Sequence, residues 1–220
     1  MIRQIERTIL LILLFIGEQL PSAGLQLAGQ TQQFGTGFWW LVGSLFLLIM
    51  LLITVLYWQL YRHTLAPAYQ TTRRRLQKKD YGWFGLGFVA MVIVNASTLP
   101  FMQQSGNTNV DNISTLMTLF GVFTLIYLAI LGPILEEIIF RGLLMNWFFS
   151  TRPAVAIGVS AIVFGTMHVN LFGGQLDLVY WLSKILLGGI LATVYWRTKR
   201  LKTTIWLHIL NNALPLVLGI

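Results

Sequence analysis

The sequence predicts an all-α protein, a polytopic transmembrane bundle of about seven spans that forms a single domain over residues 1–220. Three observations predict this fold class. Of the 220 residues, 56% are hydrophobic and only 10% are charged, whereas globular domains carry about a quarter charged residues. The mean hydropathy is +0.72. Apolar runs recur at intervals of roughly twenty residues, which is the length of helix that crosses a bilayer core.

Seven apolar runs form the predicted spans. The fourth is too long for one simple span, because at about 1.5 Å per residue it exceeds a hydrocarbon core of about 30 Å. We therefore expect a kink at Gly132-Pro133, or a segment that projects beyond the core. The runs cover residues 8–28, 38–61, 82–101, 113–149, 154–170, 178–196 and 203–220.

The basic residues predict the orientation. Thirteen of the fifteen lysines and arginines precede the first span or follow the second, fourth and sixth spans, and the opposite connections contain none. Cytoplasmic loops hold the excess of Lys and Arg, so we predict a multi-pass protein of the cell membrane with a cytoplasmic amino terminus. The net charge of +8 then reflects topology and not nucleic-acid binding. The thirteen are Arg3, Arg7, Arg62, Arg73, Arg74, Arg75, Lys78, Lys79, Arg152, Arg197, Lys199, Arg200 and Lys202.

The first span has two interpretations. Arg3 and Arg7 before an apolar run, with "PSAG" after it, are also typical of a secretory signal. Glu18 and Pro21 interrupt the run, and this favours a retained helix. The chain contains no cysteine, which excludes disulfides, thiolate nucleophiles and thiolate metal sites.

A few ionisable residues lie inside the apolar spans, where charges are costly and persist mainly if they pair or line a functional cavity. Residues four apart on a helix share a face, so Glu137 and Arg141 can form an ion pair while Glu136 is turned by about 100°. Phe164 and His168 share a face in the same way. The ionisable set is Glu18, Glu136, Glu137, Arg141, His168, Lys184 and His208.

The remaining members of this set allow simpler roles. His208 and Asn212 also lie four apart, so three helices can each offer one polar edge to a common site. A lone intramembrane histidine or asparagine is also typical of hydrogen bonding between helices. Glu18 and Lys184 are interpreted as snorkelling, cavity-facing or interhelical residues.

The ordered set "EEIIFR", "FGTMH" and "HILNN" resembles the CPBP family, the CAAX proteases and bacteriocin-processing enzymes, also called the Abi family. The patterns of this family are EExxxR, FxxxH and HxxxN or similar on successive membrane helices. The resemblance covers about residues 132–212, within a motif-bearing core of about 113–220. It implies an intramembrane glutamic-type endopeptidase that acts on a membrane-associated peptide or protein in the lipid bilayer, such as a CAAX-type, bacteriocin or pheromone substrate, without a cofactor.

The resemblance also implies roles for individual residues. Glu136 is the general base that activates water, and His168 assists it. His208 and Asn212 stabilise the oxyanion of the tetrahedral intermediate. Glu137 and Arg141 form a supporting ion pair that holds the motif helix in shape.

Two alternatives stay open at this stage. A non-proteolytic immunity or scaffold protein could bind a bacteriocin-like peptide or another partner in the bilayer. A zinc-dependent membrane protease could use the glutamates and histidines as ligands, although the chain has no HExxH and the Glu137–Arg141 pair would remove one ligand. Small-residue pairs such as Gly188/Gly189 allow close helix contact but specify no oligomeric state.

The depths of His168 and His208 in the membrane have to be reconciled if both belong to one site. Tilted helices, a broken helix or shifted span ends would reconcile them. His208 lies about six residues from the basic end of its span, whereas His168 lies about sixteen residues from Arg152. At about 1.5 Å per residue, straight and upright helices would place the two imidazoles at different depths.

Overall fold

The computed structural model describes residues 2–29, 35–64, 76–102, 108–169 and 176–218, and every regular element in these ranges is helical. Arg73, Arg74 and Arg75, which contribute to the predicted orientation, lie outside the described residues. The elements are α1 (Ile2–Gly29), α2 (Thr36–Thr64), α3 (Lys78–Thr98), the 3₁₀ turn η2 (Leu99–Phe101), α4 (Thr108–Ile126), the π-helical η3 (Tyr127–Leu131), α5 (Gly132–Glu137), the π-helical η4 (Ile138–Leu144), α6 (Met145–Phe148), α7 (Pro153–Met167), α8 (Leu178–Thr198) and α9 (Leu201–Leu218).

Within the described ranges, five helical segments are long and apolar enough to cross a membrane. Helix α7 is a shorter apolar helix, and α9 completes a set that agrees with about seven predicted spans. Large apolar side chains such as Leu52, Ile93 and Trp206 are exposed on the outside of the bundle. Water would not favour such a surface, but lipid does, so the chain is a multi-pass membrane protein. The five segments are Arg3–Leu27, Gly37–Thr64, Lys78–Phe101, Phe120–Phe148 and Leu178–Thr198.

The fourth apolar run breaks at Gly121. This residue has φ 20° and ψ −96°, a conformation that glycine adopts easily because it lacks a Cβ atom. The chain turns back there, so the Thr124 hydroxyl donates a hydrogen bond to the Leu116 carbonyl, eight residues earlier, at 3.0 Å. The predicted site of the kink, Gly132-Pro133, stays helical, with Gly132 at φ −56° and ψ −57°. The sharp bend therefore lies eleven residues before the predicted position.

Beyond the bend, the chain runs through η3, α5, η4 and α6 as one helical path, which we call the motif helix. Two π-helical segments flank α5. Pro133 stands in the first turn of α5, where its missing N–H disturbs the hydrogen-bond ladder least. Such π segments occur often at functional sites, because they turn side chains away from the regular helical positions.

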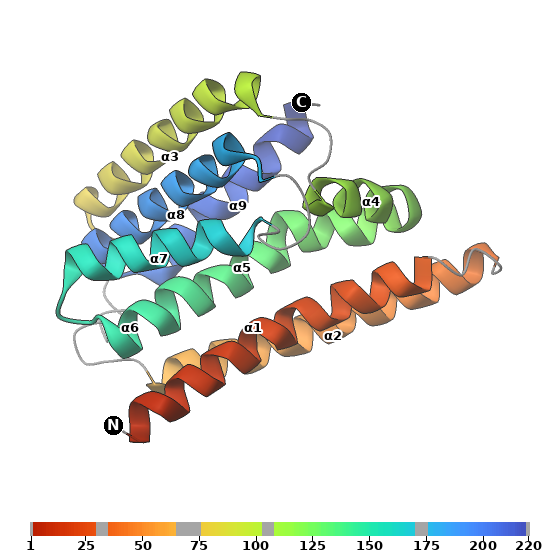
Figure 1. The fold of residues 1–220 in the computed structure, drawn as a ribbon, viewed down its shortest axis with the longest axis horizontal. Coiled ribbons are helices and arrows are strands. Elements are labelled where there is room, and N and C mark those ends of the chain that lie inside the picture. The colour runs from red at the N-terminus through yellow and green to blue at the C-terminus, as the bar shows by residue number, and fades with distance from the viewer. Residues whose placement is uncertain (1, 30–34, 65–75, 103–107, 170–175, 219–220) are drawn as a thin grey trace.

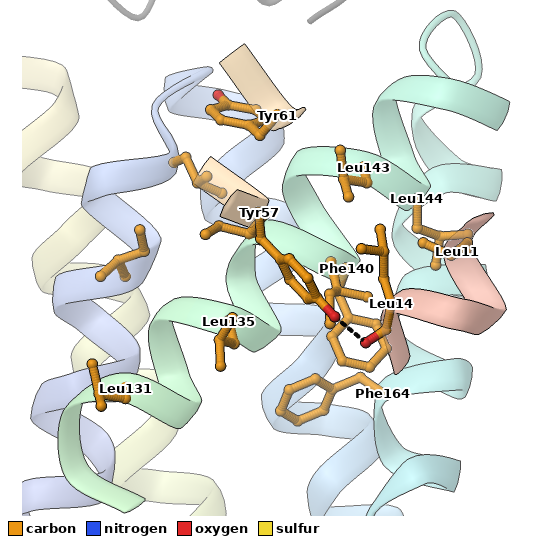
Figure 2. Close-up of a cluster of buried hydrophobic side chains, with 14 of the residues drawn as sticks. Leu11, Leu14, Tyr57, Tyr61, Leu131, Leu135, Phe140, Leu143, Leu144 and Phe164 are labelled. Carbon is orange, nitrogen blue, oxygen red and sulfur yellow. Dashed lines mark hydrogen bonds between the residues drawn. The ribbon is translucent and has the colours of Figure 1, made fainter. Parts of the chain in front are cut away.

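The motif helix lies between the α1–α2 pair and a second group formed by α3, α7, α8 and α9 (Figure 1). Its apolar side chains form the centre of the main core, in which Leu135, Ile138 and Leu143 are fully buried. In Figure 2, the Tyr57 hydroxyl donates a hydrogen bond to the Leu14 carbonyl at 2.6 Å, which ties α2 to α1 beside the core.

Close packing of α7 on α8 places the second motif. A Cβ atom on Gly165 would come within 2.7 Å of the Ile185 backbone nitrogen, and one on Gly188 would meet the Phe164 ring at 3.0 Å. The two helices can approach this closely because these positions are glycines. Gly87 of α3 is likewise packed against Leu207 and Val194.

Basic segments lie at one end of the bundle. The amino-terminal ends of α1, α3, α7 and α9 and the carboxyl-terminal ends of α2 and α8 are gathered there (Figure 1). This arrangement agrees with the alternation of basic and non-basic connections along the sequence. The cytoplasmic position of this end stays a prediction from the charge pattern.

Candidate active site

The Glu137–Arg141 pair forms inside the motif helix as the four-residue spacing predicts. Arg141 Nη1 lies 2.8 Å from Glu137 Oε1, and both side chains are fully buried. Arg141 Nη2 also donates a hydrogen bond to the Gly188 carbonyl of α8 at 2.7 Å. The guanidinium stacks over the Phe164 ring, 4.7 Å from its centroid. Arg141 therefore ties the motif helix to both α7 and α8.

Glu137 also holds the third motif. Its Oε1 lies 3.1 Å from Nδ1 of His208, so Nδ1–H donates to the carboxylate. His208 is 3% exposed, and its ring packs edge to face against Phe164 at 5.7 Å. The ion pair thus orients an imidazole as well as supporting its own helix, a contact that helical spacing alone does not indicate.

Glu136 faces both histidines. Its Oε2 lies 3.8 Å from Nε2 of His168 and 3.7 Å from Nε2 of His208. The Glu136 and His168 side chains are each 23% exposed, whereas Glu137 is fully buried. Glu136 Oε2 is itself buried and makes no hydrogen bond within the protein. The adjacent glutamates therefore differ in their surroundings: Glu137 is bonded through Oε1 to Arg141 and His208, whereas Glu136 lines the cavity.

His168 is oriented by its own helix. It caps the carboxyl terminus of α7, and its Nδ1 lies 2.7 Å from the Phe164 carbonyl oxygen. The carbonyl can only accept, so Nδ1 carries the proton in the neutral ring and Nε2 presents a lone pair toward Glu136. The Phe164 and His168 rings lie 4.5 Å apart. The backbone carbonyl one turn earlier therefore fixes the tautomer, and the Phe164 ring packs against the imidazole it orients.

The two histidines reach one carboxylate because their helices are tilted. Helices α7 and α9 are inclined to each other (Figure 1). His168 follows the last residue of α7, whereas His208 lies in the first half of α9. The sequence-based difference in depth assumes that both helices are upright, and helices that are inclined to each other do not meet this assumption.

Asn212 lies in the same cavity but contacts a different partner. Its Nδ2 donates to the Leu128 carbonyl of η3 at 3.1 Å, and the described residues give it no hydrogen bond to Glu136, His168 or His208. Helical spacing predicts that Asn211 points aside, but it lines the same cavity. It accepts a hydrogen bond from Asn95 of α3 at 2.8 Å and donates one to Asn212 Oδ1 at 3.2 Å.

The predicted site residues Glu136, His168, His208 and Asn212 line one cavity of about 260 Å³. A single water occupies roughly 30 Å³ in the liquid, so this space admits water together with part of a peptide. The cavity walls come from α1, α3, the motif helix with α4, α7, α8 and α9.

The first helix also contributes to the cavity, which is one of the roles that the sequence left open for Glu18. Glu18 of α1 is 3% exposed and accepts a hydrogen bond from the Tyr127 hydroxyl at 2.6 Å. The neighbouring Gln19 amide also bonds to Glu18. Glu18, Tyr127 and Lys184 all line the cavity. A buried ionisable residue in an apolar run was the available signal for Glu18 and Lys184, but nothing in the sequence pairs Tyr127 with Glu18.

No group of three or more His, Cys, Asp or Glu residues is arranged to hold a metal ion within the part of the chain that the structure describes.

Comparison with known proteins identifies the segment that carries this site. Residues 118–214 match the family model described as type II CAAX prenyl endopeptidase Rce1-like. No curated protein and no solved structure matches the chain. The matched segment begins just before Gly121, contains the whole motif helix with α7 and α8, and ends just after Asn212. On this match and on the three motifs that form the cavity, residues 118–214 are similar to the Rce1-like membrane proteases of the CPBP family.

Proposed function

We propose that this protein is a glutamic-type intramembrane endopeptidase that hydrolyses a peptide bond in a membrane-associated peptide or protein. One observation carries the proposal: Oε2 of Glu136 makes no hydrogen bond within the protein, lies within 3.8 Å of the Nε2 atoms of both motif histidines, and belongs with them to one cavity wall. Glu137 Oε2 is also unbonded, but only Glu136 lines the cavity, and a buried carboxylate that borders a cavity favours a chemical role. The contribution of α1 to the cavity further supports treating residues 1–220 as one functional unit.

The arrangement supports water activation by Glu136. Atoms 3.7 to 3.8 Å apart are too far for direct hydrogen bonds but can each reach one water placed between them. Glu136 takes a proton from this water while the water oxygen attacks the carbonyl carbon of the substrate. His168 accepts the second hydrogen bond of the water through its Nε2 lone pair, and this fixes the direction of attack.

His208 and Asn212 are the proposed oxyanion donors. Glu137 accepts from His208 Nδ1, and this buried carboxylate would stabilise His208 as an imidazolium that has bound a second proton from solvent before the attack. The Nε2–H of that imidazolium donates to the developing oxyanion. The second N–H of the Asn212 amide is the other donor. The proton held by Glu136 finally passes to the leaving nitrogen, the C–N bond breaks, and the products are a carboxylic acid and an amine.

The experiment is cleavage of a membrane-peptide library by the purified protein in detergent. We expect Glu136→Gln to lower kcat/KM roughly 10²- to 10⁴-fold, the usual contribution of a general base. Its thermal unfolding should stay close to that of the wild type, because the glutamine is nearly isosteric. The matched control is Glu6→Gln, which changes an exposed glutamate of α1 and should leave cleavage unaltered.

Each library reaction is repeated with a strong chelator. Cleavage that depends on Glu136 and survives chelation supports the proposal. Loss on chelation and recovery with zinc would favour a metalloprotease instead. Equal rates for the wild type and Glu136→Gln would overturn the glutamic mechanism, and a scaffold or immunity role would then account better for the protein.

A further inference from the structure

Lys184 is a cavity cation that the proposed mechanism does not use. It lies on α8 and lines the same cavity as Glu136 and His168. It is close enough to act electrostatically on Glu136, His168 and His208. The half-buried Lys184 side chain therefore borders the cavity that contains Glu136 and His168.

The position of Lys184 follows from the face that α8 turns toward the cavity. Tyr180, Lys184, Leu187 and Leu191 all line it, and their spacing of four, three and four residues marks one helical face. One turn beyond Lys184, the Gly188 carbonyl accepts the hydrogen bond from Arg141. Contact between α8 and the motif helix thus fixes Lys184 beside the catalytic carboxylate.

Lys184 is half-buried and, unlike the buried charges, has no partner of opposite charge within contact distance in the part of the chain that the structure describes. Among the described residues, its ammonium forms no ion pair and no hydrogen bond, and it lies 5.0 Å from the centroid of the Tyr180 ring. By contrast, Glu137 is bonded to Arg141 and His208, and Glu18 to Tyr127. A lysine inside an apolar span is costly unless it is paired or serves a function. The missing partner is therefore expected from the substrate.

We propose that Lys184 is a specificity-determining residue that binds a carboxylate of the peptide substrate. The inference rests on the proposed peptidase function. A peptide carries two kinds of carboxylate, its free carboxyl terminus and the side chains of Asp or Glu. Either would form a charge-assisted hydrogen bond with the ammonium group, and such bonds are strong in a site from which most water is excluded.

The test uses the library peptide that is cleaved fastest in a Glu136-dependent reaction. It is prepared with a free carboxyl terminus, with an amidated terminus, and with its acidic side chains replaced by amides. We expect one of these two modifications to raise the wild-type KM roughly 10- to 100-fold, the range for losing a hydrogen bond to a charged group. The modification that has this effect identifies the source of the carboxylate.

Variants of Lys184 complete the design. Lys184→Met should raise KM for the unmodified peptide by a similar factor and should no longer distinguish it from the modified peptide. Lys184→Arg keeps the charge and should restore most of the discrimination. The matched control is Lys202→Met, an exposed lysine at the basic end of α9, which should behave as the wild type does.

Other outcomes overturn the inference. If Lys184→Met lowers kcat equally for all three peptides, Lys184 acts on Glu136 or the histidines and not on the substrate. If the wild type ignores both modifications while cleavage still depends on Glu136, the subsite assignment fails and the peptidase function stands. If no cleavage depends on Glu136, the proposed function fails and this inference fails with it. If Lys184→Met does not fold, Lys184→Gln takes its place, and a folded Lys184→Gln protein that still distinguishes the three peptides as the wild type does overturns the inference.

Discussion

Glu137 is the residue on which two of the three motifs converge. Its carboxylate accepts from Arg141 of the same helix and from His208 of α9. Arg141 in turn reaches the Gly188 carbonyl of α8. If either Glu137 or Arg141 lost its charge, the charge of the other would remain buried without a partner to compensate for its lost hydration.

At this scale we predict that Arg141→Met is strongly destabilising. Both members of the pair are fully buried, and removing one partner of such a pair typically costs about 3–5 kcal/mol. Cleavage should fall as well, because His208 depends on Glu137 for its orientation. Thermal unfolding in detergent measures the stability, and kcat/KM for the best library peptide measures the activity.

The double variant Glu137→Gln/Arg141→Met is the control for this prediction. Without the glutamate charge, nothing charged is left unpaired at this position, so the double variant should be more stable than Arg141→Met alone. Equal or lower stability of the double variant would show that Arg141 acts through its contacts with Gly188 and Phe164 and not through the ion pair.

At the scale of elements, the crossing of α7 and α8 sets the distance between His168 and Glu136. Gly165 lies three residues before His168, and its Cα faces the backbone of Ile185. The two helices therefore pack so closely that a methyl group added at Gly165 would force one of them to move.

We predict that Gly165→Ala lowers kcat/KM by more than tenfold. The added Cβ would lie 2.4 Å from Ile185 Cγ1 and 2.7 Å from its backbone nitrogen, so α7 must shift and carry His168 with it. Misplacement of a catalytic group by about 1 Å can cost roughly 100-fold in rate. The measurement is cleavage of the best library peptide together with thermal unfolding.

Gly158→Ala provides a matched change on the same helix. A Cβ atom at Gly158 meets nothing within 4 Å, and alanine favours the helix by about 1 kcal/mol over glycine. This variant should be as active as the wild type and at least as stable. If both variants lose a similar share of kcat/KM, replacing any glycine of α7 impairs the helix itself. The close packing of Gly165 against Ile185 would then not explain the loss.

At the scale of the whole molecule, the periodicity of the sequence predicted contacts between residues of the same helix. It did not predict contacts between residues of different helices. Spacing of four residues correctly paired Glu137 with Arg141 and aligned Phe164 with His168, because helical geometry alone decides these contacts. Hydropathy likewise identified the spans. The hydrogen bonds of Glu137 with His208 and of Glu18 with Tyr127 join distant segments, so only the packed bundle specifies them.

The bend in the fourth run shows the same limit. Proline is the usual cause of a kink, so the sequence favoured Gly132-Pro133 over Gly121. Pro133 is tolerated because it lies in the first turn of a helix that follows a π segment. Gly121 takes the reversal because its positive φ suits the fold-back of α4 onto its own earlier turn. Packing between distant segments therefore decides where the fourth apolar run bends, and the periodicity of the sequence carries no information about that packing.

The orientation of the bundle is a property of the whole chain, and the absence of cysteine makes it directly testable. We predict that Arg3→Cys and Lys202→Cys, at the basic end, react with a membrane-impermeant maleimide only after cells are permeabilised. Gly35→Cys and Leu176→Cys, in exposed positions between spans on the opposite side, should react in intact cells. The reason is that basic connections stay in the cytoplasm, and the structure gathers the basic helix ends together (Figure 1).

The Arg3→Cys variant tests the first span at the same time. Helix α1 packs on the core through Leu11 and Leu14 and places Glu18 in the cavity, so a retained helix is needed for a complete site. Label at position 3 should therefore remain on the purified full-length protein, as gel fluorescence and intact mass would show. A purified chain that is active but begins after residue 28 would mean that α1 is a cleaved signal, and that Glu18 is dispensable for catalysis. Labelling of position 3 in intact cells would instead invert the topology and place the basic end outside.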